Sequence, residues 1–171
     1  MPVTIRSAYN EPEVIRKLFT EYTDMLCRMD GDFANYLQVQ DYSHELENPG
    51  EKYALPGGRL YLVEVDNQAV GCVALHRLNE TECEIKRLYI RPPFRGQGLA
   101  RALVRRVIAS AQDIGYKFML LDTFPNLEAA IRLYESEGFY RVPRYNDNPM
   151  DSMVYLKLDL DGYQQGCHRS L

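Results

Sequence analysis

The segment from Glu84 to Ala111, EIKRLYIRPPFRGQGLARALVRRVIASA, constrains the fold most, because it joins a strand, a glycine loop and a helix without interruption. Its first part contains apolar, β-branched and aromatic residues that favour a strand, Ile85, Leu88, Tyr89 and Ile90. Pro92 and Pro93 end that strand because proline supplies no backbone N–H. The helix follows directly, with apolar residues at helical spacing at Leu99, Leu103, Val107, Ala111 and Ile114.

The loop Arg95–Ala100, RGQGLA, has the properties of an anion-binding site. The first N–H groups of a helix lack partners within the helix, and the helix dipole adds positive potential there. Gly96 and Gly98 allow positive φ angles and close approach of a ligand, and Arg95 adds a cationic side chain. A phosphate or pyrophosphate is the expected ligand. A plain turn, in which the glycines serve only the backbone geometry, stays open as the alternative.

Two familiar phosphate-binding motifs do not fit this loop. A dinucleotide-binding fingerprint needs a third glycine, but Gly98 is followed by Leu99, Ala100 and Arg101. A P-loop needs a lysine and a hydroxyl residue directly after its last glycine, and Leu99 and Ala100 stand there instead. The loop matches a different pattern, R/Q-x-x-G-x-G/A, through Arg95, Gly98 and Ala100.

The length and charge of the chain limit its organisation and its partners. With 171 residues, of which 46% are hydrophobic, we expect one domain over residues 1–160 and a loosely ordered tail over 161–171. The net charge of -4 disfavours nucleic acid as a partner, although Arg91–Arg106 is rich in arginine. No apolar run reaches the roughly 18 residues of a membrane-spanning helix, and the N-terminus lacks the apolar core of a signal peptide. We therefore expect a cytoplasmic protein without a membrane partner.

The cysteines and histidines predict neither disulfides nor a metal site. The cysteines form no C-x-x-C pair and stand mostly among apolar neighbours, which favours buried free thiols in a reducing compartment: Cys27, Cys72, Cys83 and Cys167. The histidines are scattered and show no metal-ligand spacing: His44, His76 and His168. We therefore expect no metal ion.

The other segments predict a mixed α/β fold, an antiparallel meander joined to a parallel strand–helix–strand unit with flanking helices. The predicted strands are Val3–Arg6, Leu60–Val65, Val70–Leu75, Glu82–Ile90, Lys117–Thr123, Phe139–Val142 and Met153–Leu158. The predicted helices run from a cap at Asn10 to Met29, from Asp41 to Leu46, from Gly98 to Gly115, and from a cap at Asn126 to Gly138.

The connection Asp32–Gly58 is the least readable part of the chain. It is long for a compact domain, and long connections often have a function. Tyr42 and Tyr53 stand in it beside acidic residues such as Glu45. It lines a substrate pocket or forms a surface loop, and the sequence leaves both interpretations open.

The order of these elements, together with two motifs, resembles the GNAT superfamily, the acetyl-CoA-dependent N-acetyltransferases. The first motif is the loop segment LYIRPPFRGQGLARAL. The second is NLEAAIRLYESEGF, which is similar to the family pattern A-x-x-x-Y-x-x-x-G-F through Ala130, Tyr134, Gly138 and Phe139. The resemblance extends over nearly the whole chain, from about Val3 to Leu160. It implies the GNAT fold, with acetyl-CoA as co-substrate.

The resemblance also implies where acetyl-CoA binds. Backbone groups of the strand before the loop would pair with its pantetheine arm, and amides of the loop and the first helical turn would hold its pyrophosphate. The N–H of Leu88 would stabilise the thioester oxygen as charge develops on it. The implied cofactor-binding residues are Leu88, Tyr89, Ile90, Arg95, Gly96, Gln97, Gly98, Leu99, Ala100, Arg101, Asn126 and Tyr134.

Acetyl transfer to an amine requires a base and is helped by an acid. A lysine-like amine, with a pKa of about 10.4, must lose a proton before it attacks, and an acid eases departure of the CoA thiolate. The family places a tyrosine at Tyr134, the candidate acid; the alternative is a packed aromatic residue whose hydroxyl only hydrogen-bonds the sulfur. Glu84 is the candidate base, and its alternative is a solvated glutamate paired with Lys86 or Arg87. Asp122 is a second candidate base.

The leading hypothesis is an N-acetyltransferase that transfers an acetyl group from acetyl-CoA to the primary amine of a small molecule or an amino-acid-like substrate. Direct attack in a ternary complex fits better than a covalent route, because Cys72 and Cys83 lie in predicted strands. The alternative is a non-catalytic acyl-CoA-binding sensor or partner protein on the same fold, and a nucleic-acid-binding domain is a third hypothesis. The sequence leaves a homodimer open.

Overall fold

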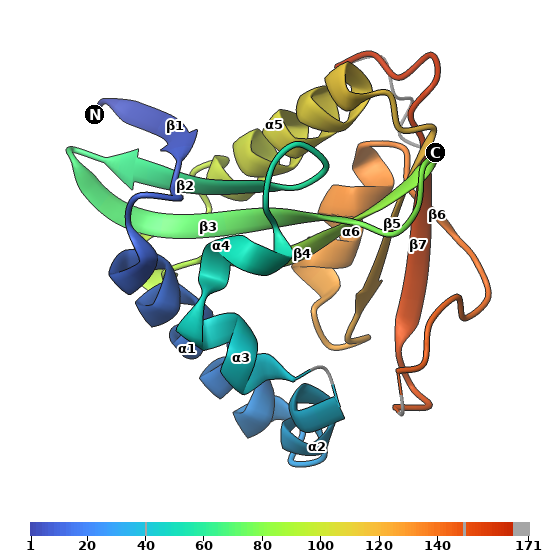
Figure 1. Cartoon of the computed structure of the whole chain (residues 1–171), viewed down its shortest axis with the longest axis horizontal. Helices are drawn as coiled ribbons and strands as arrows, with labels where there is room; N and C mark the ends of the chain where they lie inside the picture. Colours follow the sequence, from blue (N-terminus) through green and yellow to red (C-terminus); the bar gives the residue numbers. More distant parts are fainter. Residues whose placement is uncertain (40, 149, 166–171) are drawn as a thin grey trace.

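A seven-stranded sheet forms the centre of the computed structural model, which describes residues 1–39, 41–148 and 150–165 (Figure 1). The strands lie in the order β1-β2-β3-β4-β5-β7-β6. Neighbours pair antiparallel except β4 and β5, which are parallel. The predicted mixed fold is therefore confirmed. The strands are β1 Val3–Ser7, β2 Arg59–Val65, β3 Gln68–Arg77, β4 Glu82–Ile90, β5 Phe118–Thr123, β6 Tyr140–Arg141 and β7 Val154–Asp159.

Helices cover both faces of this sheet (Figure 1). The helices α1 to α4 contribute to a core on one face, which includes Phe19, Tyr53 and Leu62. The helices α5 and α6 contribute to the core on the other face, which includes Leu103 and Tyr134. The helices are α1 Pro12–Met29, α2 Phe33–Val39, α3 Tyr42–Glu47, α4 Pro49–Lys52, α5 Leu99–Ile114 and α6 Glu128–Ser136, with a 3₁₀ helix, η1, at Pro92–Phe94.

β4 and β5 separate soon after they pair. Their parallel register ends at the pair Glu84–Leu120, while β4 continues to Ile90. This part of β4 contains a bulge, where the register against β3 shifts and Arg87 has a φ of 59°. α5 connects the two strands, as the predicted crossover requires. The uncovered edge of β4 thus lies at the C-terminal end of the parallel pair, where open α/β sheets bind ligands.

The predicted cap of the first helix is wrong by one residue. The helix begins at Pro12, with Glu11 at the N-cap position, and Asn10 lies before it. The N–H of Glu11 donates to the oxygen of Ala8 at 3.0 Å, which closes a turn around Asn10. Pro12 suits the first helical position because its φ is fixed and an N–H there would have no helical partner.

The predicted cap of the last helix is also wrong by one residue. Leu127, not Asn126, holds the N-cap position of α6. The N–H of Leu127 donates to the oxygen of Phe124 at 3.1 Å, so Asn126 stays in a turn before the helix. That turn leaves the Asn126 side chain outside the helix, at the wall of a cavity described below.

Three short helices occupy most of the connection Asp32–Gly58. The sequence predicted one of them, α3, and missed α2 and α4. Long-range hydrogen bonds hold the segment: Arg16 Nε donates to the oxygen of Leu46 at 2.7 Å, and the hydroxyl of Tyr9 donates to the oxygen of Tyr53 at 2.7 Å. These helices depend on tertiary contacts, since single turns are not stable alone.

The first residues of the predicted tail are bound to the domain. The hydroxyl of Tyr163 donates to Oε2 of Glu137 at 2.7 Å, and Gln112 Nε2 donates to the oxygen of Leu160 at 3.0 Å. Glu137 is fully buried, so this contact ties residues 161–163 to the end of α6. Cys167 and His168, which the sequence analysis considered, lie outside the described residues.

Candidate active site

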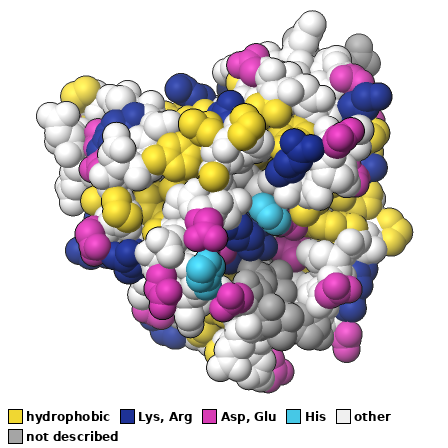
Figure 2. All heavy atoms as spheres, viewed as in Figure 1, with side chains coloured by type: hydrophobic (Ala, Val, Ile, Leu, Met, Phe, Trp, Pro, Cys, Tyr) yellow, Lys and Arg dark blue, Asp and Glu magenta, His cyan; other side chains and the backbone are white. Residues whose placement is uncertain are grey.

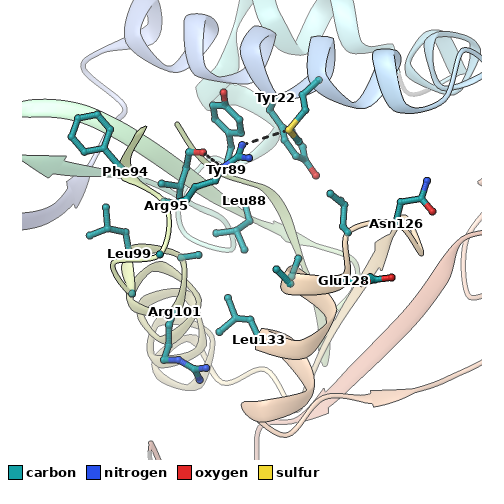
Figure 3. A pocket seen from close by; sticks show the side chains of 18 residues that line it. Tyr22, Leu88, Tyr89, Phe94, Arg95, Leu99, Arg101, Asn126, Glu128 and Leu133 are labelled. Atoms are coloured by element: carbon teal, nitrogen blue, oxygen red, sulfur yellow. Dashed lines mark hydrogen bonds between the residues drawn. The ribbon is translucent and has the colours of Figure 1, made fainter. Parts of the chain in front are cut away.

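A cavity of about 460 Å³ opens between α1, the loop before α5 and the start of α6 (Figure 3). Two predicted cofactor-binding residues, Gln97 and Tyr134, do not line it. The cavity is walled in part by β4, at Leu88, Tyr89 and Ile90, beyond the end of its pairing with β5. It brings together the other predicted cofactor-binding residues, Leu88, Tyr89, Ile90, Arg95, Gly96, Gly98, Leu99, Ala100, Arg101 and Asn126.

The glycine loop has the geometry of an anion cradle. Gly96 and Gly98 have φ angles of 78° and 79°, in the left-handed region that favours glycine. A Cβ placed on either residue would meet nothing within 4 Å, so the backbone conformation, not crowding, requires glycine. The same open space leaves room for a ligand beside the first turn of α5, whose N–H groups lack helical partners.

Arg95 of the loop and Arg101 of the first turn of α5 are already engaged by neighbours. Arg95 Nε donates to the oxygen of Ile90 at 2.8 Å, and its guanidinium lies 5.7 Å from the ring centre of Tyr89. Arg101 Nη1 lies 2.5 Å from Oε1 of Glu137. Arg95 therefore fastens the loop to β4 and keeps a positive charge at the cavity. The Arg101 side chain is turned to Glu137, and its backbone lies in the first turn of α5.

Tyr134 is held in the core beside the cavity. Its exposed fraction is 6%, and its ring packs edge-on against Phe139 at 5.4 Å. The predicted end of α6 is confirmed: Gly138 has a φ of 106°, and the N–H of Phe139 donates to the oxygen of Tyr134 at 3.1 Å. Burial raises the pKa of the Tyr134 hydroxyl well above its usual range, so the proton stays on at neutral pH.

Tyr22 is a tyrosine of the site that the sequence analysis missed. It lines the large cavity and also a small cavity of about 30 Å³, whose lining includes residues of β4 and β5. Figure 3 shows its ring reaching from α1 into the large cavity. Burial raises its pKa to about 12. Its position among the apolar residues of α1 is that of an ordinary core residue, and only the structure reveals that it lines both cavities.

Glu84 is buried and surrounded by three partners. The hydroxyl of Tyr145 donates to its Oε2 at 2.5 Å, His76 Nδ1 lies 3.5 Å from its Oε1, and Lys86 Nζ lies 3.6 Å from the same oxygen. Burial alone would raise the pKa of Glu84, but Lys86, His76 and Tyr145 lower it to about 2. The carboxylate is therefore ionised at neutral pH and holds the loop of Tyr145 to the sheet.

Asp122, the second candidate base, orients the loop between β6 and β7. Asn146 Nδ2 and Asn148 Nδ2 donate to its Oδ2 at 2.8 and 3.2 Å. Asp122 lines the small cavity together with Lys86 and Arg87. The acidic Asp122 and the basic Lys86 and Arg87 thus line the same small cavity.

A buried ion cluster beside Glu84 was not predicted either. Arg87 donates from Nε and Nη2 to both oxygens of Glu45, at 2.8 and 3.1 Å. Lys52 Nζ lies 3.4 Å from Oε1 of the same glutamate. Figure 2 shows cationic, acidic and histidine side chains gathered in the middle of this face. The sequence gives no signal for the cluster, because its residues come from α3, α4 and β4.

The described residues offer no metal centre and no activated thiol. No group of three or more His, Cys, Asp or Glu side chains in the described part of the chain is arranged to hold a metal ion. Cys72 and Cys83 are free and buried, and burial raises the pKa of both thiols. Within the described ranges, no helix has both the length and the apolar character needed to cross a membrane.

Comparisons with known proteins agree with this geometry. The sequence model of the Acetyltransferase (GNAT) family matches residues 19–139. An uncharacterized N-acetyltransferase of Schizosaccharomyces pombe is 41% identical over 132 residues, which cover 75% of this chain and 80% of that protein. N-acetylaspartate synthetase of Danio rerio is 34% identical over 146 residues, which cover 84% of this chain and 46% of that protein.

Solved structures show the same fold. A Streptococcus agalactiae acetyltransferase superposes with a TM-score of 0.74 at 18% identity, over 92% of this chain and 98% of that one. A GNAT family acetyltransferase from Elizabethkingia anophelis with acetyl-CoA bound has a TM-score of 0.54 at 25% identity, over 60% of this chain and 76% of that one. The fold and these relatives define an acyltransferase enzyme. The chain belongs to the GNAT family of N-acetyltransferases, which confirms the resemblance seen in the sequence.

Proposed function

We propose that this chain transfers the acetyl group of acetyl-CoA to the primary amine of a small-molecule or amino-acid-like acceptor. The observation that carries the proposal is the loop of Gly96 and Gly98, which opens on the large cavity beside the uncovered edge of β4. The Elizabethkingia anophelis relative has acetyl-CoA bound, and the name of the Danio rerio relative contains an acetylated amino acid. Both support the proposal.

Backbone groups of this chain would hold acetyl-CoA. The first amides of α5, at Leu99, Ala100 and Arg101, would donate to the pyrophosphate, and the helix dipole would add to that attraction. The free edge of β4 would hydrogen-bond the pantetheine arm, and the N–H of Leu88 would stabilise negative charge on the acyl oxygen. Bound acetyl-CoA supplies an activated thioester. The open space beside Gly98 supports this fit, because a ligand there meets no side chain.

Two tyrosines can donate a proton or a hydrogen bond to the departing thiolate. Tyr134 occupies the family position, and Tyr22 lines the cavity itself. Both hydroxyls keep their protons at neutral pH, because burial raises the pKa of each. We assign the main role to Tyr134 and a supporting contact to Tyr22.

Glu84 acts in this proposal as an anchor for the acceptor ammonium. Its pKa of about 2 makes it a weak base, because efficient proton transfer needs a pKa near the working pH. Its negative charge still attracts an ammonium group, and a chain of waters then removes the proton from the amine. Direct attack within a ternary complex fits the buried thiols of Cys72 and Cys83, which are poor nucleophiles.

Calorimetric titration with acetyl-CoA, and separately with NAD, tests the proposal. We expect saturable binding of acetyl-CoA alone, followed by CoA release when an amine is added. Gly98→Asp should weaken acetyl-CoA binding by at least about 10-fold, because a carboxylate would face the phosphates. Gly98→Ala is the matched control, since it carries the same strain at positive φ without the charge. Unchanged affinity in Gly98→Asp would contradict the assignment of the loop.

A further inference from the structure

The large and the small cavity lie next to each other along three segments of the chain. In β4, residues 88–90 line the large cavity and residues 85–87 line the small one. In α1, Tyr22 lines both cavities. After β5, Phe124 lines the small cavity and Leu127 lines the large one. The same three segments therefore wall both cavities, and on β4 the boundary falls between the two ranges.

The direction of the bound cofactor places its acyl group at this boundary. In the proposed function the pyrophosphate lies at the glycine loop, which follows β4, and the pantetheine arm runs back along the edge of β4 to Leu88. The parallel pairing with β5 ends at Glu84, before this part of β4. An acyl group carried beyond Leu88 therefore extends toward Arg87 and into the small cavity.

The small cavity has room for an acetyl group and little more. Its volume is about 30 Å³, and one water needs roughly 10–15 Å³ of such space. It therefore holds about two or three groups the size of a water, which a methyl group and the attacking amine nitrogen fill. The apolar residues that line it are Leu26, Phe33, Ile85, Phe124 and Met153.

Phe33 and Phe124 form a rigid part of this lining. Their exposed fractions are 3% and 4%, and their rings pack edge-on with centres 5.1 Å apart. Phe33 begins α2 and Phe124 directly follows β5, so the contact joins two elements of the same core. A longer acyl group enters only by pushing these rings apart, and a close-packed interior resists such a shift.

We propose that Phe33 and Phe124 limit the length of the acyl group, so that the chain accepts acetyl-CoA and rejects butyryl-CoA and longer acyl-CoA esters. The methyl group of the acetyl then lies against the two rings, and a longer chain collides with them. This inference rests on the proposed acetyl transfer and names the class of acyl donor for that same site. A ring pair that serves only the hydrophobic core is the competing explanation.

Acyl donors that differ only in chain length test the inference. Acetyl-, propionyl- and butyryl-CoA are compared with one acceptor, the standard amino acid that releases CoA from acetyl-CoA fastest. CoA release is followed with a thiol reagent. We expect kcat/KM to fall about 10-fold or more from acetyl- to propionyl-CoA and about 100-fold or more to butyryl-CoA, because each further methylene must fit the same closed space. Butyryl-CoA that reacts as well as acetyl-CoA would overturn the inference.

Substitution of the rings separates the length limit from folding. Phe33→Leu and Phe124→Leu should each raise the ratio of butyryl-CoA to acetyl-CoA kcat/KM about 10-fold. Because the ratio is taken within one variant, a partial loss of folded protein cancels. Phe19→Leu is the matched control, since Phe19 is buried in the same core and packs edge-on against Tyr53 but lines neither cavity. An unchanged ratio in both ring variants, or an equal rise in Phe19→Leu, would show that the rings serve only the core.

A binding experiment without turnover distinguishes this inference from the proposed function. Acetyl-CoA and butyryl-CoA are titrated calorimetrically into the wild type and both ring variants, with no acceptor present. If the wild type transfers both acyl groups equally well, the length limit is refuted and acetyl transfer stands. If butyryl-CoA binds the wild type about 10-fold more weakly than acetyl-CoA and the ring variants remove that difference, but no amine releases CoA, acetyl transfer fails and the length limit stands.

Discussion

The carboxyl group of Glu84 is 5% exposed and still ionised, because Lys86, His76 and Tyr145 face it. Such a group contributes more to electrostatics and stability than to proton transfer. Its folded-state pKa of about 2 lies below its value in an unfolded chain, about 4.3. The ionised form therefore stabilises the fold above that unfolded value, and the stabilisation is lost as the pH falls through the folded-state pKa.

Glu84→Gln should remove this pH-dependent stabilisation. We expect the variant to lose about 3 kcal/mol of unfolding free energy at pH 7, because it leaves Lys86 without its carboxylate partner. The loss should shrink between pH 4.5 and about pH 2, where wild-type Glu84 becomes protonated. Urea unfolding of the wild type and the variant across this pH range measures the difference in unfolding free energy. A constant difference at every pH would mean that packing, not charge, explains the effect.

We expect substitutions of Tyr134 and Tyr22 to lower catalytic activity to different extents. Tyr134→Phe should lower kcat about 10- to 100-fold, the lower part of the usual range for an acid catalyst. It should leave the affinity for acetyl-CoA nearly unchanged, because an acid acts mainly as the thiolate departs, whereas β4 and the start of α5 would hold the cofactor. Steady-state kinetics and calorimetry with the same amine measure both quantities.

Tyr22→Phe is the matched control for Tyr134, since it removes the same hydroxyl from a tyrosine that lines the cavity itself. We expect a loss of activity of less than about 10-fold, because a supporting hydrogen bond contributes about 1 kcal/mol. If Tyr134→Phe keeps full activity and Tyr22→Phe loses most of it, Tyr22 on α1, and not Tyr134, is the acid.

The elements that the sequence predicted well are those encoded locally. The bounds of β4 agree with the prediction, and α5 starts within one residue of it, because prolines and glycines mark their ends. The motif of Gly96 and Gly98 also lies in one short segment, so its positive φ angles and its place at a helix N-terminus could be predicted. Most of the residues that the sequence predicted to bind the cofactor come from this one segment, and they line the large cavity.

The buried ion cluster beside Glu84 could not be predicted in the same way. Glu45, Lys52 and Arg87 come from α3, α4 and β4, and only the folded chain brings them together. The helices that carry Glu45 and Lys52 are six and four residues long, too short for a helical pattern to show. The sequence placed Tyr22 on an apolar face, where it could not be told from a core residue.

At the scale of the whole molecule, the sheet is divided by the gap between β4 and β5. Helices α1 to α4 pack on one face and α5 and α6 on the other, and the cavity lies where the two strands part. Its walls come from α1, β4, the loop before α5 and α6. A ligand in this cavity would therefore contact β4 and helices from both faces of the sheet.

Binding of acetyl-CoA should therefore stabilise the whole fold. A ligand at 100 times its Kd adds about 2.7 kcal/mol to the unfolding free energy when it binds only the folded chain. For a chain of this size, that corresponds to a rise in Tm of roughly 5–10 °C. Differential scanning fluorimetry measures the rise, and Gly98→Asp should reduce it while Gly98→Ala retains most of it. An equal rise in Gly98→Asp, or one produced by NAD, would place the stabilising ligand outside the cavity of α1, β4 and α6.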